Sequence, residues 1–316
     1  MNRNGHAQDG IPLYVCERKS VDESGALSLC SNFKREEKQL KGVRYDVDVV
    51  ARAHELYFGH NLTLRMIRHD LLMEFGVDIR PSTVLKWFQK YVPIVYDYIL
   101  TLTPRVSDTW HMDEVDIRLR GGFERKKRGG QHGFGFGIRC PVTKFVHAFG
   151  TIMSEDAKDV SAVLLLARAM TKKTPAVIVS DDAGSFPAAI DLAFEDVSTK
   201  PLHVIARKGI GQRNGNQSSE RLNNTFREWG KHRGFKSVDT PLLVGWMINY
   251  NFVRPHMELG DGLEDTPAHA AGLNIVSGKD KWLQLLTLAL RISRDFLSNG
   301  VFAAPLLKTP QNPVVS

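Results

Sequence analysis

The pattern of apolar positions changes twice along the chain. Residues 1–45 are polar and mixed in charge, with little periodicity, which is typical of a flexible arm or a small module. From residue 46 the apolar residues recur three and four positions apart, as they do on one face of a helix. This spacing predicts two helices on either side of Gly59, and a third that begins at Pro81 after a turn over residues 76–80.

The three helices of residues 46–92 predict a helix-turn-helix domain, because the third helix follows a tight turn. In such a domain the third helix enters the major groove of DNA. The alternative is a small helical bundle that only packs on the rest of the protein. Two prolines, Pro93 and Pro104, bound the next stretch, and residues 93–104 are interpreted as a linker.

Beyond the linker the apolar positions alternate, as they do in a half-buried strand. The predicted elements, in chain order, are strands over residues 111–120, 133–139 and 144–149, a helix over 157–170, a strand over 176–180, a helix over 188–194, a strand over 202–205, and a helix that opens at Glu220. This order predicts a mixed α/β sheet with helices on both faces. A final amphipathic helix is predicted at residues 281–297.

Three acidic residues fall in distinct settings within this α/β region. Asp113 lies on the first predicted strand, Asp181 directly follows a short apolar strand, and Glu220 opens a helix. Carboxylates on two strands and a helix can hold a pair of Mg²⁺ ions, which stabilise the attacking and leaving oxygens of a phosphodiester displacement. Each acid also has an ordinary interpretation: an exposed strand residue, a turn residue, and a first-turn glutamate that complements the helix dipole. The neighbouring acids Glu114, Asp116 and Asp182 are rival candidates.

The helix of Glu220 has two different faces. Leu222, Phe226 and Trp229 recur at i, i+4 and i+7 and define the buried side. The opposite side carries Glu220 together with three polar or basic residues, namely Asn224, Arg227 and Lys231. A single acid among such residues suits a metal ligand flanked by contacts to DNA phosphates.

The charge balance agrees with a polyanionic partner. The net charge is +7 and the sequence pI is about 9.3, although a basic soluble enzyme would show the same balance. Two basic segments near the proposed acids are candidates for contacts to the DNA backbone. Their residues are Arg125, Lys126, Lys127 and Arg128 in the first segment, and Arg207 and Lys208 in the second.

The remaining composition narrows the class of protein further. Three cysteines without a CxxC pair indicate neither a zinc module nor a disulfide framework. We found no signal peptide and no apolar run near the roughly 18 residues that span a membrane. A cytoplasmic, nucleoid-associated protein is therefore expected, with no membrane partner.

Several segments closely resemble the DDE transposases of prokaryotic insertion sequences. They are WHMDE at residues 110–114, SDDAGSFP at 180–187, NQSSERLNNTFRE at 216–228, YNFVRPHMELG at 250–260 and TPAHAAG at 266–272. The similarity runs from about residue 46 to residue 275, and Cys140 departs from it, because relatives often carry an aspartate there. The resemblance implies a helix-turn-helix region before a ribonuclease H-like catalytic domain at residues 105–275, followed by a C-terminal helix and tail at 276–316.

The resemblance also implies the activity. The metal-binding catalytic acids would be Asp113, Asp181 and Glu220, and they would hold two Mg²⁺ ions, for which Mn²⁺ can substitute. The enzyme would be a Mg²⁺-dependent DNA transposase that binds the terminal inverted repeats of its element, cleaves the strands and transfers them to target DNA. Double-stranded DNA would be its partner, and a homodimer or larger synaptic complex would be expected.

Two other functions stay open at this point. One is a domesticated, non-mobilising DNA-binding protein on the same fold. The other is a hydrolase of another substrate that uses two carboxylates for acid–base chemistry. The basic segments and the predicted helix-turn-helix argue against the hydrolase.

Overall fold

The computed structural model describes residues 45–118, 132–152, 156–206, 217–230, 233 and 240–298, together with five short strands before residue 45. The side chains of residues 116–118, 132–133, 217–218 and 293–298 lie outside this description, as do those of the five strands. The chain forms two compact units, residues 1–50 and 51–316. None of the helices within the described ranges has the length and apolar character needed to cross a membrane.

The first unit contains strands that the sequence pattern did not predict. They are β1 (Asn2–His6), β2 (Pro12–Val15), β3 (Lys19–Val21), β4 (Leu27–Leu29) and β5 (Phe33–Lys34). The first, second and fifth form an antiparallel sheet in the order β1-β2-β5, and β3 pairs with β4.

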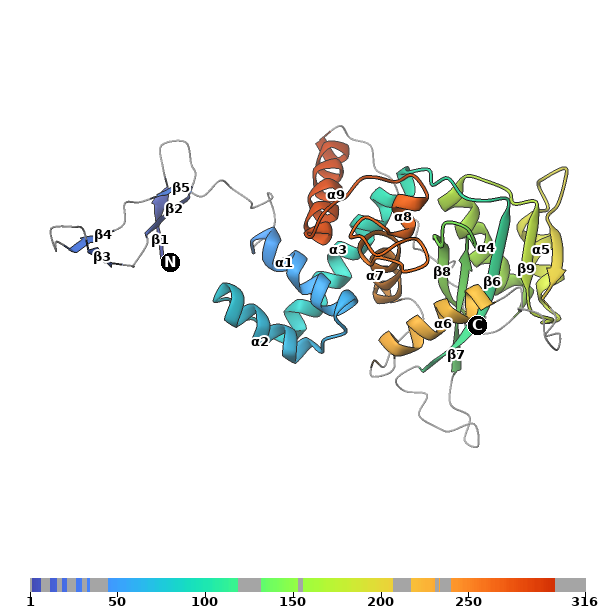
Figure 1. Ribbon diagram of the computed structural model, residues 1–316, viewed down its shortest axis with the longest axis horizontal. Coiled ribbons are helices and arrows are strands. Elements are labelled where there is room, and N and C mark those ends of the chain that lie inside the picture. Colours follow the sequence, from blue (N-terminus) through green and yellow to red (C-terminus); the bar gives the residue numbers. More distant parts are fainter. Residues whose placement is uncertain are drawn as a thin grey trace, which may run out of the picture. The chain divides into compact units, whose positions relative to one another are not determined.

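The predicted helices of the N-terminal helical region are confirmed. The first differs from the prediction because its last turn is π-helical. They are α1 (Val47–His54), which continues as the π-helical turn η1 (Glu55–Gly59), then α2 (Leu64–Phe75) and α3 (Pro81–Thr101) (Figure 1). The Thr63 hydroxyl caps α2 by accepting a hydrogen bond from the Met66 backbone N–H. Gly76 ends α2 with φ +68°, a left-handed conformation that glycine adopts without strain.

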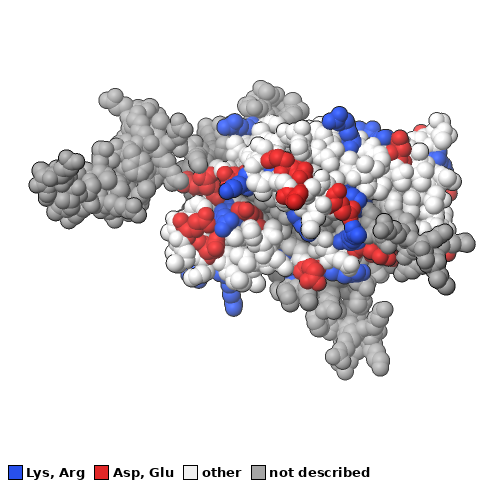
Figure 2. All heavy atoms as spheres, viewed as in Figure 1, with Lys and Arg blue, Asp and Glu red and all other residues white. Residues whose placement is uncertain are grey.

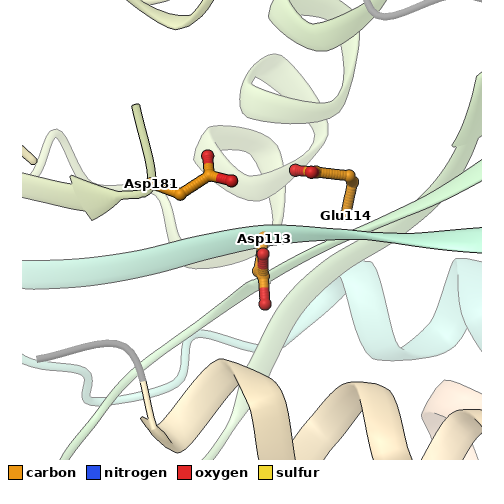
Figure 3. A group of neighbouring side chains, drawn as sticks. All are labelled: Asp113, Glu114 and Asp181. Atoms are coloured by element: carbon orange, nitrogen blue, oxygen red, sulfur yellow. The ribbon is translucent and has the colours of Figure 1, made fainter. Parts of the chain in front are cut away.

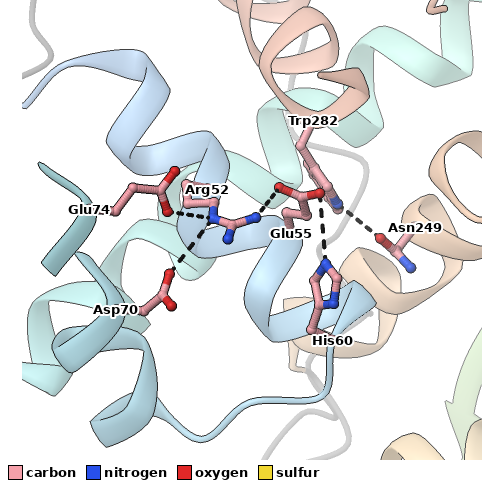
Figure 4. Close-up of polar contacts among 7 residues, drawn as sticks. All are labelled: Arg52, Glu55, His60, Asp70, Glu74, Asn249 and Trp282. Carbon is pink, nitrogen blue, oxygen red and sulfur yellow. Dashed lines mark hydrogen bonds and ion pairs between the residues drawn. The ribbon is translucent and has the colours of Figure 1, made fainter. Parts of the chain in front are cut away.

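Arg52, near the end of α1, links η1 to α2 through its guanidinium group. Arg52 donates to Glu55 over 3.0 Å and to Glu74 over 2.9 Å, and its Nε lies 3.7 Å from an Asp70 carboxylate oxygen (Figure 4). Ion pairs this near the surface each contribute little to stability, so the group mainly links the two segments.

The linker prediction is wrong for residues 93–101, because α3 continues through Pro93 to Thr101. A proline inside a helix costs about 3 kcal/mol, since it removes one backbone hydrogen bond and crowds the preceding turn. Here Val92, Val95 and Ile99 are all buried, and α3 packs against three later helices. This burial offsets the cost, and sequence periodicity alone did not reveal it.

The second unit contains a five-stranded mixed sheet. Its elements are β6 (Thr109–Arg118), β7 (His132–Arg139), β8 (Val146–Ile152), α4 (Ala157–Thr171), β9 (Val177–Ser180), α5 (Phe186–Ala193), β10 (Leu202–Ile205) and α6 (Gln217–Gly230). The strand order is β10-β9-β6-β7-β8, in which β6, β7 and β8 are antiparallel neighbours and β9 and β10 run parallel to β6. This order and these directions define a ribonuclease H-like sheet, so the predicted fold class is confirmed.

Helices cover both faces of this sheet. On one face, Trp110 and Met112 of β6 form a core with apolar residues of α4 and α5. On the other face, α6 packs against β6 and β7, and the following helix α7 (Pro241–Ile248) packs against β8 (Figure 1). Because strand residues alternate in direction, Asp113 faces α6.

The chain after α7 closes the structure around α3. The turn η2 (Asn249–Val253), the short α8 (Pro267–Ala270) and the predicted final helix, observed as α9 (Lys281–Ser298), follow in order. Trp282 of α9 donates from its indole to the Asn249 side chain over 3.0 Å, which ties α9 to η2.

Candidate metal centre

The pairing of β6 with β9 brings the two aspartates together. In this parallel pair His111 lies opposite Val179, so continuing the register by two positions sets Asp113 beside Asp181. Asp181 comes directly after the carboxyl end of β9, where ligands gather in open α/β sheets. The rival Asp182 is exposed, whereas Asp181 is half-buried.

Three carboxylates form a group at this point. Ligand oxygens of Asp113, Glu114 and Asp181 all lie within 4.8 Å of one another. The side chains of Asp181 and Glu114 point toward one another, and that of Asp113 leaves the strand on the side of α6 (Figure 3). The Oδ1 atom of Asp181 is buried and has no hydrogen-bond partner among the residues that the structure describes. This donor set suits a hard divalent cation such as Mg²⁺.

The raised pKa of Asp113 also favours a cation site at this point. The pKa of Asp113 is raised to about 6, chiefly by burial and also by the negative charges of Asp181 and Glu220, while Arg227 opposes the change. Carboxylates that share a site repel one another and retain protons. A divalent cation would remove that repulsion and leave the acids ionised.

Glu220 lies on the helix that faces Asp113. The predicted faces of α6 are as observed: Leu222, Phe226 and Trp229 are buried, and Glu220 is exposed. Its carboxylate is outside the group of three, although it is near enough to raise the pKa of Asp113. The structure therefore brings Asp113 and Asp181 together, adds Glu114, and places Glu220 on the neighbouring helix.

Asn223 is a residue of this site that the sequence analysis missed. Its Nδ2 donates to Asp113 Oδ2 over 2.8 Å and to the Glu114 backbone carbonyl over 3.0 Å. It is only 3% exposed, and its Oδ1 has no hydrogen-bond partner in the described part of the chain. The available signal was an amide next to the apolar stripe of α6, one turn after Glu220.

A glycine allows α6 to approach the strand of Asp113. Gly137 of β7 lies directly opposite Asp113 in the antiparallel pair. A Cβ atom at Gly137 would lie 3.2 Å from Leu222 and 3.3 Å from Phe149, which is tighter than most such contacts. The absence of a side chain there lets α6 lie close enough for Asn223 to reach Asp113.

Most of the predicted DNA contacts lie outside the described residues. This applies to Arg125, Lys126, Lys127, Arg128, Arg207, Lys208 and Lys231. Asn224 and Arg227 are both exposed on α6 and are joined by a 3.1 Å hydrogen bond. Over the face seen in Figure 2, the described acidic and basic side chains are interspersed.

Comparison with known proteins supports the resemblance seen in the sequence segments. No family model matches the chain. The chain is 32% identical to the transposase for the insertion sequence-like element IS431mec of Staphylococcus aureus strain Mu50 over 78 residues. This aligned segment covers 25% of this chain and 34% of that protein. The transposase for insertion sequence element IS257 in transposon Tn4003 of Staphylococcus aureus is 31% identical over the same shares. The chain spans about a third of the length of these curated relatives. Its predicted resemblance to insertion-sequence transposases is confirmed.

Retroviral integrases are among the solved structures that resemble this chain. The catalytic core domain of BIV integrase gives a TM-score of 0.35 at 15% identity, covering 52% of this chain and 93% of that one. The HTLV-2 integrase catalytic core domain in complex with magnesium gives 0.34 at 12% identity, covering 52% and 98%. Because both TM-scores are below 0.5, the assignment of the fold rests on the strand order and directions given above.

Proposed function

We propose that this chain is a DNA transposase whose catalytic centre consists of Asp113, Asp181 and Glu220. The observation that carries the proposal is the group of Asp113, Glu114 and Asp181 oxygens within 4.8 Å, with Glu220 on the helix that packs against the same strand. The similarity to insertion-sequence transposases over 78 residues supports DNA as the substrate.

Each residue has a role that follows from its position. Asp113 and Asp181 supply the oxygens at the end of the paired strands, and Glu220 supplies a third from α6. Asn223 holds one oxygen of Asp113, so the other stays directed to the centre. Two Mg²⁺ ions, when bound, would activate the attacking oxygen and stabilise the leaving oxygen.

The reaction has two displacements at phosphorus. In the first, the oxygen of water bonds to the scissile phosphorus at the element end, and the 3′-oxygen leaves as a 3′-hydroxyl. In the second, that 3′-hydroxyl attacks a target phosphate and releases a target 3′-oxygen. Both steps need the carboxylates ionised, and neither needs a covalent link between protein and DNA.

The helical region supplies a candidate DNA reader. The first turns of α3 follow the tight turn after α2, as in a helix-turn-helix, and they expose Ser82, Lys86, Gln89 and Lys90. These side chains can contact phosphates and base edges in the major groove. The exposed Asn224 and Arg227 of α6 would bind the DNA backbone near the cleaved bond. Cutting and joining two ends requires two such chains in a synaptic complex.

The test uses the full chain and a labelled duplex that carries the inverted repeat flanking the gene, with Mg²⁺ and a supercoiled target plasmid. The parent should release a 3′-hydroxyl end and join it to the plasmid. Asp181→Asn should abolish both products, and the exposed neighbour control, Asp182→Asn, should keep most of them. A parent that binds the end but forms neither product in Mg²⁺ or Mn²⁺ would identify a domesticated DNA-binding protein instead.

A further inference from the structure

The guanidinium of Arg233 lies just beyond the end of α6 and is bound by oxygens of the helical region. Its Nη2 donates to the carbonyl oxygens of Tyr57 over 2.9 Å and Leu62 over 3.3 Å. Its Nη1 donates to the Asn61 side chain and to the Trp229 carbonyl oxygen. The same group stacks 4.2 Å from the ring centre of Tyr57 and 4.5 Å from that of Trp229.

Two more hydrogen bonds join the same segments. The Trp229 indole donates to the Tyr57 carbonyl oxygen over 3.2 Å, and the Asn61 amide donates to the Glu228 carbonyl oxygen over 3.2 Å. Asn61 adopts φ +59°, a left-handed conformation that asparagine takes more readily than most residues other than glycine. The end of α6 is therefore fastened to residues 57–62 by both its backbone and its side chains.

The arrangement is costly as a source of stability alone. Burial lowers the pKa of Arg233, and no carboxylate in the described part of the chain forms an ion pair with it. Apolar residues of similar size often stabilise a buried site as well as or better than a buried charge. A planar guanidinium, however, sets the direction of several acceptors at once, which an apolar side chain cannot do. The observed contacts therefore indicate a role in geometry.

The geometry that Arg233 controls is that of α6. This helix is held at two places, at its end by Trp229 and Arg233 and in its middle by Asn223, which binds Asp113. Glu220 lies one turn before Asn223, and its carboxylate forms no hydrogen bond or ion pair with the described residues. Because a helix moves as a rigid rod, rotation or sliding at its end displaces the Glu220 carboxylate relative to Asp113 and Asp181.

We propose that Arg233 is a positioning residue. It holds the end of α6 against residues 57–62 and thereby fixes the position of the Glu220 carboxylate relative to the metal centre. This inference rests on the proposed function, since it assigns Glu220 to the metal site. It also makes the helical region a structural part of the catalytic centre, in addition to any DNA that it binds.

The test compares Arg233→Met and Arg233→Lys with Arg168→Met in the full chain. Arg168 serves as the control, because it also binds a backbone carbonyl, that of Ala193, and stacks on an aromatic ring, that of Phe194. It differs in lying on α4 and in pairing with Asp196. Two quantities are measured: Mn²⁺ affinity by calorimetry without DNA, and the Mg²⁺ concentration for half-maximal cleavage. Thermal melting reports the fold.

Arg233→Met should weaken Mn²⁺ binding and raise the Mg²⁺ midpoint by about tenfold or more, the usual cost of losing a residue that orients a metal ligand. Arg233→Lys should show a smaller change in Mn²⁺ affinity and Mg²⁺ midpoint than Arg233→Met. If Arg233→Met does not fold, Arg233→Lys is the variant that tests the proposal. Arg168→Met should lower the melting temperature alone. In a Glu220→Gln background, Arg233→Met should cause no further loss of Mn²⁺ affinity, since it acts through Glu220.

Two results would overturn the inference, and they differ. If the parent cleaves DNA and Arg233→Met has the parental midpoint and affinity with only a lower melting temperature, Arg233 is structural and the proposed function stands. If the parent neither binds Mn²⁺ nor cleaves, the proposed function fails and this inference fails with it.

Discussion

Asn223 of α6 donates a 2.8 Å hydrogen bond to Asp113 of β6, two residues that are 110 positions apart in the chain. The same amide group also binds the Glu114 backbone, so it holds both the strand and the carboxylate that the strand presents. In a metal site, a partner of this kind would fix the orientation of the half-buried Asp113 carboxylate. The helix that carries Glu220 is thus fixed directly to the strand that carries Asp113.

Asn223→Ala should reduce strand cleavage by about 10- to 100-fold, because Asp113 loses the donor that orients it. The unfolding free energy should fall by about 1–3 kcal/mol, the cost of leaving buried polar groups without a partner. A cleavage time course and a denaturant titration measure the two effects. Thr225→Ala on the same helix loses only a bond to the Arg221 carbonyl and should leave cleavage near the parental rate. Equal rates for Asn223→Ala and the parent would show that the hydrogen bond has no part in catalysis.

Glu220→Gln should keep the fold and the DNA affinity but lower cleavage by orders of magnitude. The substitution is isosteric at an exposed position, and a neutral amide is a poor ligand for Mg²⁺. Cleavage of labelled end DNA in Mg²⁺ gives the rate, and gel shifts in Ca²⁺ give the affinity. Glu195→Gln, an exposed glutamate beyond α5, controls for the loss of one negative charge. Parental cleavage by the Glu220 variant would remove this residue from the catalytic centre.

The stability of the metal-free protein should carry a pH-dependent contribution from Asp113. Its pKa of about 6 in the folded protein lies above the value of about 3.9 in an unfolded chain. Between these values the folded state binds more protons, so the contribution of Asp113 to the unfolding free energy falls as the pH rises from about 4 to 6. It is regained as the pH falls. Mg²⁺ should reverse the loss at pH 7, because it binds the ionised carboxylate.

The measurement must separate Asp113 from histidines that act with the opposite sign, among them His147, His203 and His256, whose pKa values are all lowered by burial. Burial lowers the pKa of His147 to about 3 and that of His256 to about 4, so both favour unfolding as the pH falls. The informative quantity is therefore the melting-temperature difference between the parent and Asp113→Asn, measured with EDTA at pH 4 to 7. The melting temperature of Asp113→Asn should rise relative to that of the parent as the pH rises. A difference that does not change with pH would mean that Asp113 titrates at its ordinary pKa.

Gly137→Ala should push α6 away from the sheet. The added methyl group would contact Leu222 and Phe149, both buried, and overpacking of this kind costs about 1–3 kcal/mol. Cleavage should fall more than stability, because Asn223 and Glu220 move with α6. Gly230→Ala is the matched control: its Cβ would meet only ordinary contacts at 3.9 Å. Thermal melting and cleavage of both variants test this, and a Gly137→Ala protein as active as Gly230→Ala would contradict it.

Local spacing in the sequence was enough to predict the elements that carry the centre. Strand β10 was predicted with its observed bounds, Leu202–Ile205, and helix α4 to within one residue at its end. The buried face of α6 was also predicted, since the i, i+4, i+7 spacing follows from helix geometry alone. These features depend on backbone periods, which a short stretch of chain determines by itself.

The tertiary structure decided which of these elements meet. The sequence analysis named Asp113 and Asp181, but only the pairing of β6 with β9 places them side by side and brings Glu114 to them. It showed no reason for α3 to continue through Pro93, for Asn223 to bind Asp113, or for Arg233 to bind residues 57–62. Each of these depends on contacts between residues far apart in the chain. Their energies arise only when the whole core is packed, and no local pattern of apolar and polar residues contains that information.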